Sequence, residues 1–296
     1  MVFQEKQRVG LVLAGGSGSR LAPISRATCK QLLPIYNKPL IYYSLSTLLL
    51  AGIREILIIS TPKDLPRFED LFGDGSQLGL EIKYKEQPKP EGLAQAFLLG
   101  EGFINNRPSA LVLGDNLFYS HELGKYLKKA NKNKNCTLFG YRVNNELIKQ
   151  YGVAVLRDGK LIEIEEKPSN PKSNIAITGL YFYNDKVCEY AKKLKPSARG
   201  ELEISHLNNI FINDKVADLE ILGRGSAWLD TGSPSQLLQA SHFVQTIEDR
   251  TGLMIANIEE ICFLNKWVNK NQLSNIIDKM GNNDYKKYLE GLLKNE

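Results

Sequence analysis

VGLVLAGGSGSRL, residues 9–21, joins a short run of apolar, β-forming residues directly to a glycine-rich turn. The run from Val9 to Ala14 predicts a buried strand. Glycines after a strand let backbone N–H groups approach phosphate oxygens with no Cβ in the way. Arg20, and Lys30 in the following KQLLP, add two cations. The stretch therefore predicts a strand whose carboxyl end carries an anion-binding loop.

The chain on either side of this loop alternates between strand-like and helical patterns. Further strands are expected at Glu55–Ser60, Glu81–Glu86, Ala110–Leu113 and Cys136–Tyr141. Helices are expected at Leu40–Leu50, Asp64–Phe72 and Gly92–Phe103. This alternation predicts an α/β fold with a Rossmann-like, mostly parallel mixed sheet flanked by helices. Ligands of such sheets bind at the carboxyl ends of the strands.

The pattern changes after Tyr151. GVAVLRDGKLIEIEEKP, residues 152–168, alternates apolar and polar residues on both sides of Asp158-Gly159, a dipeptide typical of hairpin turns. We expect a small antiparallel insertion beside the main sheet. From Pro234 onward the pattern is helical, which predicts a C-terminal helical extension.

Composition limits the class of ligand. The 296 residues include 38 Lys and Arg against 33 Asp and Glu, a net charge of +5, which favours small anions over nucleic acid.

No apolar stretch has the length of a membrane span or of a signal core, so we expect a cytoplasmic protein with no membrane partner. A disulfide framework or structural zinc is not expected, because the cysteines are scattered without a CxxC pair: Cys29, Cys136, Cys188 and Cys262.

Two common phosphate-binding motifs do not fit the loop. No GxxxxGK[ST] spacing of a P-loop is present. A GxGxxG dinucleotide fingerprint starting at Gly16 would need its third glycine where Leu21 stands. The missing glycine also disfavours a nicotinamide-dependent oxidoreductase.

GGSGSRL at 15–21, Pro23 and KQLLP at 30–34 together resemble the signature of the sugar-phosphate nucleotidyltransferases. Similar segments continue to the C-terminus and resemble the glucose-1-phosphate thymidylyltransferase branch: QPKPEGLAQAF (87–97), LVLGDNLFY (111–119), KPSARGELEI (195–204) and GRGSAWLDTG (223–232). The resemblance implies a nucleotide-diphospho-sugar transferase fold. It also implies magnesium-dependent joining of dTTP and glucose 1-phosphate to dTDP-glucose and pyrophosphate, the first step toward dTDP-sugars such as dTDP-rhamnose.

The resemblance further implies roles for particular residues. The catalytic set is Arg20, Lys30, Asp115, Lys167 and Asp230. The nucleotide-binding set is Gly15, Gly16, Gly18, Ser19, Arg20, Gln31, Gln87, Gly92 and Asp115. The set binding the sugar phosphate is Leu93, Tyr151, Gly152, Glu166, Lys167, Ile177, Tyr181, Arg199 and Trp228.

Asp115 and Asp230 are the implied magnesium ligands. Each follows an apolar run, so each carboxylate reaches the surface where a buried element ends. Carboxylate oxygens together with substrate phosphates suit Mg²⁺. A turn or a helix cap is the other interpretation of a single Asp in such a position.

The expected organisation is a catalytic domain over 1–250, with a nucleotide-binding half (about 1–140) and a sugar-phosphate-binding half (about 141–250). By resemblance, the helical extension over 251–296 would help to form a homotetramer, a dimer of dimers. It would also help to form a regulatory site at which dTDP-rhamnose binds and inhibits the enzyme. A tail that packs only on its own subunit is the alternative. For function, the same reaction with UTP preferred and a non-catalytic sugar-nucleotide binder remain alternatives.

Overall fold

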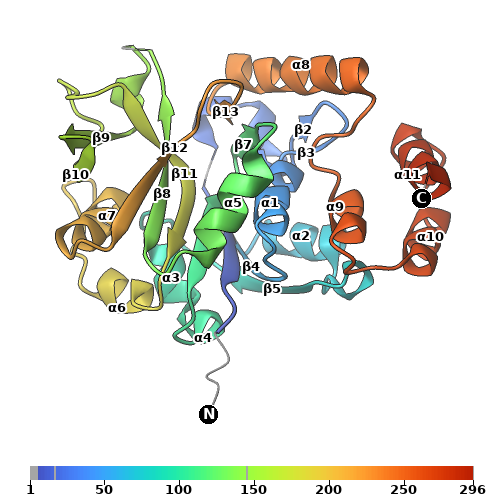
Figure 1. The fold of residues 1–296 in the computed structure, drawn as a ribbon, viewed down its shortest axis with the longest axis horizontal. Helices are drawn as coiled ribbons and strands as arrows, with labels where there is room; N and C mark the ends of the chain where they lie inside the picture. Colours follow the sequence, from blue (N-terminus) through green and yellow to red (C-terminus); the bar gives the residue numbers. More distant parts are fainter. Residues whose placement is uncertain (1–5, 17, 145, 296) are drawn as a thin grey trace.

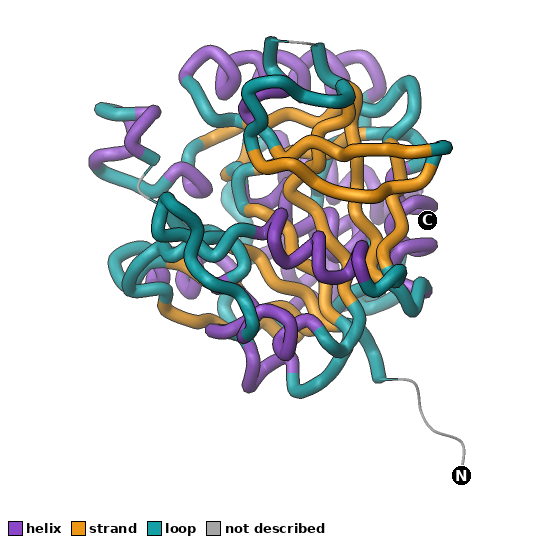
Figure 2. The backbone as a smooth tube through the Cα atoms, turned by 90° about the vertical axis from the view of Figure 1, so that its left-hand side faces the viewer, coloured by secondary structure: helices purple, strands orange, loops and turns teal. Residues whose placement is uncertain are grey.

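A twisted central sheet lies between two layers of helices in the computed structural model, which describes residues 6–16, 18–144 and 146–295 (Figures 1 and 2). Nine strands form this sheet: β1 (Val9–Leu13), β4 (Glu55–Ser60), β5 (Glu81–Glu86), β6 (Ser109–Leu113), β8 (Cys136–Arg142), β9 (Gly152–Arg157), β10 (Lys160–Glu166), β11 (Ile175–Tyr183) and β12 (Ala217–Ile221). The strand order is β10-β9-β11-β6-β1-β4-β5, and β8 pairs with β11 and β12. The strands predicted from the apolar runs are confirmed to within a residue or two at each end.

Strand direction divides the sheet into two parts. β1 pairs in parallel with β4 and β6, and β4 with β5, so the strands around the first loop form a parallel core. β11 runs antiparallel to β6, β8 and β9, which makes the sheet mixed. Two small antiparallel sheets join β13 (Ala227–Asp230) to β7 (Asn116–Tyr119) and β2 (Pro34–Ile35) to β3 (Lys38–Pro39). The α/β fold predicted from the sequence is confirmed.

Helices cover both faces of the sheet. The α-helices of the described residues are α1 (Ile41–Leu50), α2 (Leu65–Phe72), α3 (Gln95–Leu99), α4 (Glu101–Ile104), α5 (Leu123–Lys132), α6 (Val187–Lys192), α7 (Ile204–Asn213), α8 (Pro234–Thr251), α9 (Ile258–Leu264), α10 (Lys270–Asp278) and α11 (Asp284–Asn295), of which α10 and α11 lie away from the sheet (Figure 1). Successive side chains of β1 point to opposite faces: Val12 belongs to the apolar cluster of α1, α2, α5 and α9, and Leu11 to that of α3, α6 and α7. The two hydrophobic layers bury β1 on both faces, and β1 leads into the glycine-rich loop.

The single helix predicted over Gly92–Phe103 is wrong. The structure has two short helices there, α3 and α4, with Gly100 between them. A Cβ on Gly100 would lie 3.1 Å from Leu11 Cδ2 and 3.2 Å from Leu57 Cδ2, so the bare backbone packs directly on β1 and β4. Close packing on the sheet, which the helical period does not reveal, interrupts the helix at this residue.

The hairpin β9–β10 is confirmed. Asp158 and Gly159 have φ values of 50° and 73°, the left-handed pair that a two-residue hairpin turn requires. The hairpin is not separate from the main sheet, since Val153 of β9 pairs with Ala176 of β11. It lies at the far side of the molecule from α10 and α11 (Figure 1).

The predicted C-terminal helices are also confirmed. α8 begins with Pro234 in its first turn, where the Ser233 hydroxyl accepts a hydrogen bond from Gln236 N, and ends at Gly252 with φ 68°. α9 packs on α1 through Ile258, Ile261 and Cys262. All four cysteines are buried free thiols. Within the described residues, every helix is too short or too polar to cross a membrane.

Candidate active site

The loop after β1 forms a small cavity of about 240 Å³ at the carboxyl end of the strand. Gly16 and Gly18 have φ values of 106° and 56°, a backbone region that other residues rarely adopt. The Ser25 hydroxyl donates to Gly18 O at 2.7 Å and fixes the turn. Ser17 lies outside the described residues. The cavity is lined by Gly15, Gly16, Gly18, Ser19, Arg20, Leu21, Lys30, Gln31, Asp115 and Gly232.

Gln31 carries an unpaired acceptor in this cavity. Its side chain is only 4% exposed, and its Nε2 donates to Gly15 O at 3.3 Å. Its Oε1 is buried with no hydrogen-bond partner among the described residues. Buried polar atoms are usually paired, so this oxygen is suited to accept a hydrogen bond from a ligand.

Asp115 and Asp230 lie side by side although 115 positions of sequence separate them. Asp115 directly follows β6 and precedes β7, and Asp230 ends β13, where it pairs in register with Asn116 of β7. The Thr231 hydroxyl donates to Asp115 O at 3.0 Å and ties the two strand ends together. The short β7–β13 sheet therefore brings the two predicted magnesium ligands to one place.

The buried Lys30 ammonium lies between the two carboxylates. Its Nζ is 2.7 Å from Asp115 Oδ2 and 3.8 Å from Asp230 Oδ1. Burial raises the pKa of the Asp230 carboxyl, and the neighbouring Asp115 charge raises it further, whereas Lys30 and Arg20 oppose this shift. Two neighbouring carboxylates repel each other, so a cation placed between them stabilises the ionised form of both.

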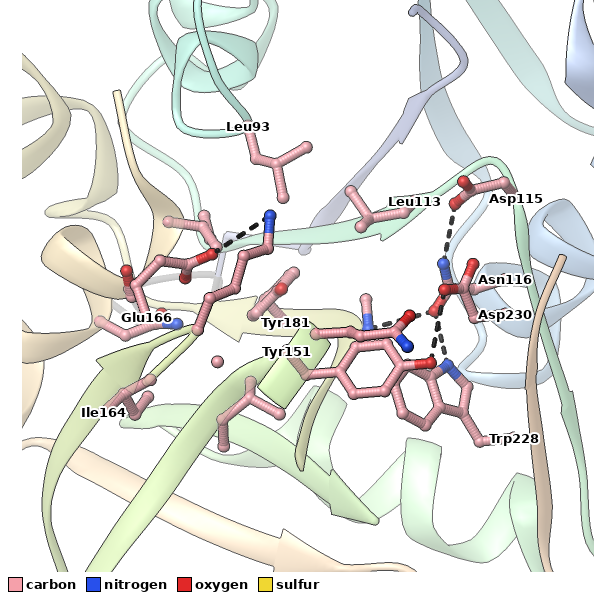
Figure 3. Close-up of a pocket in the computed structure, with 18 of the residues that line it drawn as sticks. Leu93, Leu113, Asp115, Asn116, Tyr151, Ile164, Glu166, Tyr181, Trp228 and Asp230 are labelled. Carbon is pink, nitrogen blue, oxygen red and sulfur yellow. Dashed lines mark hydrogen bonds and ion pairs between the residues drawn. The ribbon is translucent and has the colours of Figure 1, made fainter. Parts of the chain in front are cut away.

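A second cavity, of about 630 Å³, adjoins the first, because Arg20 and Asp115 line both. Figure 3 shows Glu166 at one end of this cavity and Asp115 with Asp230 at the other, with Tyr151 and Tyr181 between them. Of the residues predicted to bind the sugar phosphate, these line it: Leu93, Tyr151, Gly152, Glu166, Lys167, Ile177, Tyr181 and Trp228.

Aromatic rings and a strained lysine shape the walls of this second cavity. The rings of Tyr151 and Trp228 lie 4.9 Å apart between centroids. Burial, followed by the charge of Asp230, raises the pKa of Tyr151 to about 12, so its hydroxyl stays protonated at neutral pH. Lys167 has φ 44°, and its N–H donates to Tyr151 O at 3.1 Å. Backbone strain of this kind is concentrated at functional sites.

Asn116 was missed in the sequence, although it directly follows Asp115 in the quoted LVLGDNLFY. Its side chain is 3% exposed, and its Nδ2 donates to Asp115 Oδ1 at 2.8 Å. Its Oδ1 accepts from Trp228 Nε1 at 2.6 Å and from Gly179 N at 3.2 Å. One amide thus connects the aspartate pair to the aromatic wall of the larger cavity (Figure 3).

Three predicted residues line neither cavity. Arg199 Nη2 is 2.8 Å from both oxygens of the buried Glu203 and 3.4 Å from Glu166 Oε1, so its guanidinium is held by carboxylates at the edge of the larger cavity. Gly92 has φ 104°, and a Cβ there would lie 2.5 Å from the backbone of Leu202. Backbone conformation and close packing therefore explain why a glycine stands at this position. Gln87 is buried, and its side-chain oxygen lies against the backbone of Gly15.

The chain is similar to known proteins over almost its whole length. A family model described as nucleotidyl transferase matches residues 9–247. A glucose-1-phosphate thymidylyltransferase of Xanthomonas campestris pv. campestris is 51% identical over 290 residues, which are 97% of this chain and 98% of that protein. A glucose-1-phosphate thymidylyltransferase of Neisseria meningitidis is 50% identical over 287 residues, 96% of this chain and 99% of that protein.

A solved structure has a similar fold. It is that of a UDP-glucose pyrophosphorylase complexed with UDP-glucose, with a TM-score of 0.72 and 25% sequence identity. The match covers 81% of this chain and 99% of that one.

Proposed function

The chain belongs to the nucleotidyl transferase family, and we propose that it is a glucose-1-phosphate thymidylyltransferase, which makes dTDP-glucose and pyrophosphate from dTTP and glucose 1-phosphate. The family and the nucleotide-diphospho-sugar transferase fold predicted from the sequence are confirmed. The observation that carries the proposed reaction is the meeting of two cavities at Arg20 and Asp115. A transfer between two substrates needs such a junction.

The reaction needs positioning and charge neutralisation rather than a covalent nucleophile. In the proposed arrangement the triphosphate lies against the glycine-rich loop and the sugar phosphate occupies the larger cavity. An oxygen of the sugar phosphate attacks the α-phosphorus in line, and the bond from that phosphorus to the leaving pyrophosphate breaks. Arg20 and Lys30 neutralise the charge of the phosphates at the junction.

Asp115 and Asp230 would hold Mg²⁺. Their hard oxygen donors fit this ion, and both carboxylates lie within 4 Å of the same Lys30 ammonium, so they lie close to each other. Among the described residues no group of three or more His, Cys, Asp or Glu side chains could hold a metal alone, which agrees with a site completed by substrate phosphates. When bound, the ion would neutralise phosphate charge.

Lys167→Ala is expected to raise the apparent KM for glucose 1-phosphate about tenfold, the size of one charge-assisted hydrogen bond, with little change in kcat. Lys167 lines the larger cavity, where the sugar phosphate would lie. Steady-state kinetics with each substrate varied in turn measures the effect. Lys172→Ala, at an exposed lysine paired with Glu165, is the matched control. An effect confined to dTTP would show that the two pockets are assigned in reverse.

Asn116→Leu is expected to lower kcat/KM at least about tenfold, because it leaves Asp115 Oδ1, Trp228 Nε1 and the Gly179 N–H each without the partner that Asn116 provides. Asn116→Asp keeps an acceptor for Trp228 and Gly179 but removes the bond to Asp115. Kinetics of both variants, with thermal unfolding measured alongside, separates the two effects. Wild-type kcat/KM in a folded Asn116→Leu would remove Asn116 from the site.

The main rival is the same reaction with UTP preferred, which the likeness to UDP-glucose pyrophosphorylase favours. Pyrophosphate release from dTTP, UTP and dCTP, each with glucose 1-phosphate and Mg²⁺, tests both. A higher kcat/KM with dTTP supports the proposal, and a higher value with UTP supports the rival. No release from any triphosphate would support a non-catalytic sugar-nucleotide binder.

We also propose a catalytic domain over 1–250, with nucleotide-binding and sugar-phosphate-binding halves of about 1–140 and 141–250. The extension over 251–296 would support a homotetramer and inhibition by dTDP-rhamnose, and the protein would act in the cytoplasm. Leu253 and Leu264 of this extension are 62% and 56% exposed, and another subunit would cover them. Light scattering should give the mass of four chains. Inhibition by dTDP-rhamnose should persist at saturating dTTP if its site is separate.

A further inference from the structure

Helix α7 forms one wall of the larger cavity. Three residues from its first two turns line this cavity: Ile204, Ser205 and Asn208. The next residue, Asn209, fastens the helix to β10, because its Nδ2 donates to Ile164 O at 2.9 Å and its Oδ1 accepts from Ile164 N at 2.8 Å. Ile164 lies near Glu166, at the end of the cavity away from Asp115 (Figure 3). The α7 wall therefore adjoins that end.

Asn208 carries a buried donor that has no partner. The residue is 1% exposed, and its Nδ2 forms no hydrogen bond within the described residues. Buried amide groups are usually paired, because an unpaired one costs free energy. Ser205 Oγ, one turn earlier, is also buried and unpaired, but nothing in the described part of the chain fixes the direction of its hydroxyl. Of the two residues, Asn208 has the better-defined unused group.

Tyr183 of β11 fixes which way the Asn208 amide faces. The Tyr183 hydroxyl donates to Asn208 Oδ1 at 2.5 Å. Burial raises the pKa of Tyr183 well above its usual range, so the hydroxyl keeps its proton and needs an acceptor. An amide nitrogen cannot accept, so Oδ1 must face Tyr183. The polar group of Asn208 that is left for a ligand is therefore a donor.

A hexose phosphate fits this arrangement. The reacting phosphate has to lie at the junction with the smaller cavity, near Arg20 and Asp115, so the sugar ring occupies the part toward Glu166. Each sugar hydroxyl can both donate and accept a hydrogen bond. A carboxylate such as that of Glu166 accepts, and Asn208 Nδ2 supplies the donor that a hydroxyl oxygen needs.

We propose that Asn208, oriented by Tyr183, is a specificity-determining residue that donates a hydrogen bond to one hydroxyl of the sugar ring. The inference rests on the proposed function for the presence of a sugar phosphate in the larger cavity. It adds a residue of α7 to the walls that recognise the sugar, and it explains why this helix buries an unpaired amide at the cavity.

Asn208→Leu is the main test, because leucine has a similar volume but no donor. We would compare kcat/KM for glucose 1-phosphate with kcat/KM for its monodeoxy analogues, each of which lacks one hydroxyl. The wild type should prefer glucose 1-phosphate over the analogue that lacks the bound hydroxyl. In Asn208→Leu this preference should fall about tenfold, the size of one lost hydrogen bond, and the preference over the other analogues should stay.

Tyr183→Phe keeps Asn208 but removes the hydroxyl that orients its amide, so it should lower the preference over the same analogue. It also tests the inference if Asn208→Leu fails to fold. Asn213→Leu makes the same exchange at the exposed end of α7 and should change no preference. A merely structural role would lower thermal stability or slow all the sugar phosphates equally, so the preference is the deciding readout.

Calorimetry in the presence of a dTTP analogue that cannot be cleaved separates this inference from the proposed reaction. Tighter binding of glucose 1-phosphate than of one deoxy analogue, lost in Asn208→Leu, supports the role of Asn208 even without pyrophosphate release, which would overturn only the reaction. The wild-type preference in both variants, or an equal loss for glucose 1-phosphate and every analogue, overturns the role of Asn208.

Discussion

Asp115→Asn and Asp230→Asn are each expected to lower turnover at least about 100-fold, the size of a single electrostatic contribution to a transition state. The two carboxylates lie on either side of one cationic centre, at the junction of the two cavities. An amide keeps the shape of each side chain but removes the negative charge that a magnesium ion needs. Pyrophosphate release under saturating substrates measures the loss.

Asp70→Asn is a suitable control, because Asp70 is an exposed acid on α2, away from both cavities. Thermal unfolding of each variant shows whether the fold survives. Turnover within a few-fold of wild type in either aspartate variant would remove that residue from the proposed metal site. A loss that extra Mg²⁺ partly restores would strengthen the assignment.

Lys30→Met should have an effect of similar size, a fall in turnover of about 100-fold or more. Lys30 is 7% exposed, and its ammonium is the cation held between Asp115 and Asp230. Methionine fills a similar volume but leaves the two carboxylates facing each other and the phosphates less well neutralised. Single-turnover kinetics separates a slower chemical step from weaker dTTP binding.

Two comparisons decide what Lys30 contributes. Lys128→Met removes an exposed lysine on α5 and should leave turnover unchanged. If Lys30 only orients Asp115, the double variant Lys30→Met with Asp115→Asn should be no worse than Asp115→Asn alone. A further loss in the double variant shows that Lys30 acts on the substrates directly.

The sequence was sufficient where local pattern controls structure. Continuous apolar runs predicted the parallel core, and Asp158-Gly159 predicted the hairpin, because both depend on residues close together in the chain. Local pattern failed at Gly100, where contact with Leu11 and Leu57 divides a helix. That contact depends on the sheet and has no signal in the helical period.

The candidate site was predictable in its residue types but not in its connections. The resemblance placed Asp115 and Asp230 in one site, yet their meeting depends on pairing between β7 and β13, which are far apart in the chain. The hydrogen bonds of Asn116 and the ion pair of Arg199 with Glu203 likewise depend on tertiary contacts. A single motif shows which chemistry a side chain can perform. It does not show which neighbouring side chain already forms a hydrogen bond or ion pair with it.

The pairing of β13 with β7 also has a consequence for biosynthesis. During translation, the glycine-rich loop and Asp115 leave the ribosome long before Asp230 is made. The parallel core can form early, since β1, β4, β5 and β6 all precede residue 114. The second carboxylate arrives only with β13, so under the proposed mechanism a nascent chain would stay inactive until nearly the whole proposed catalytic domain has emerged.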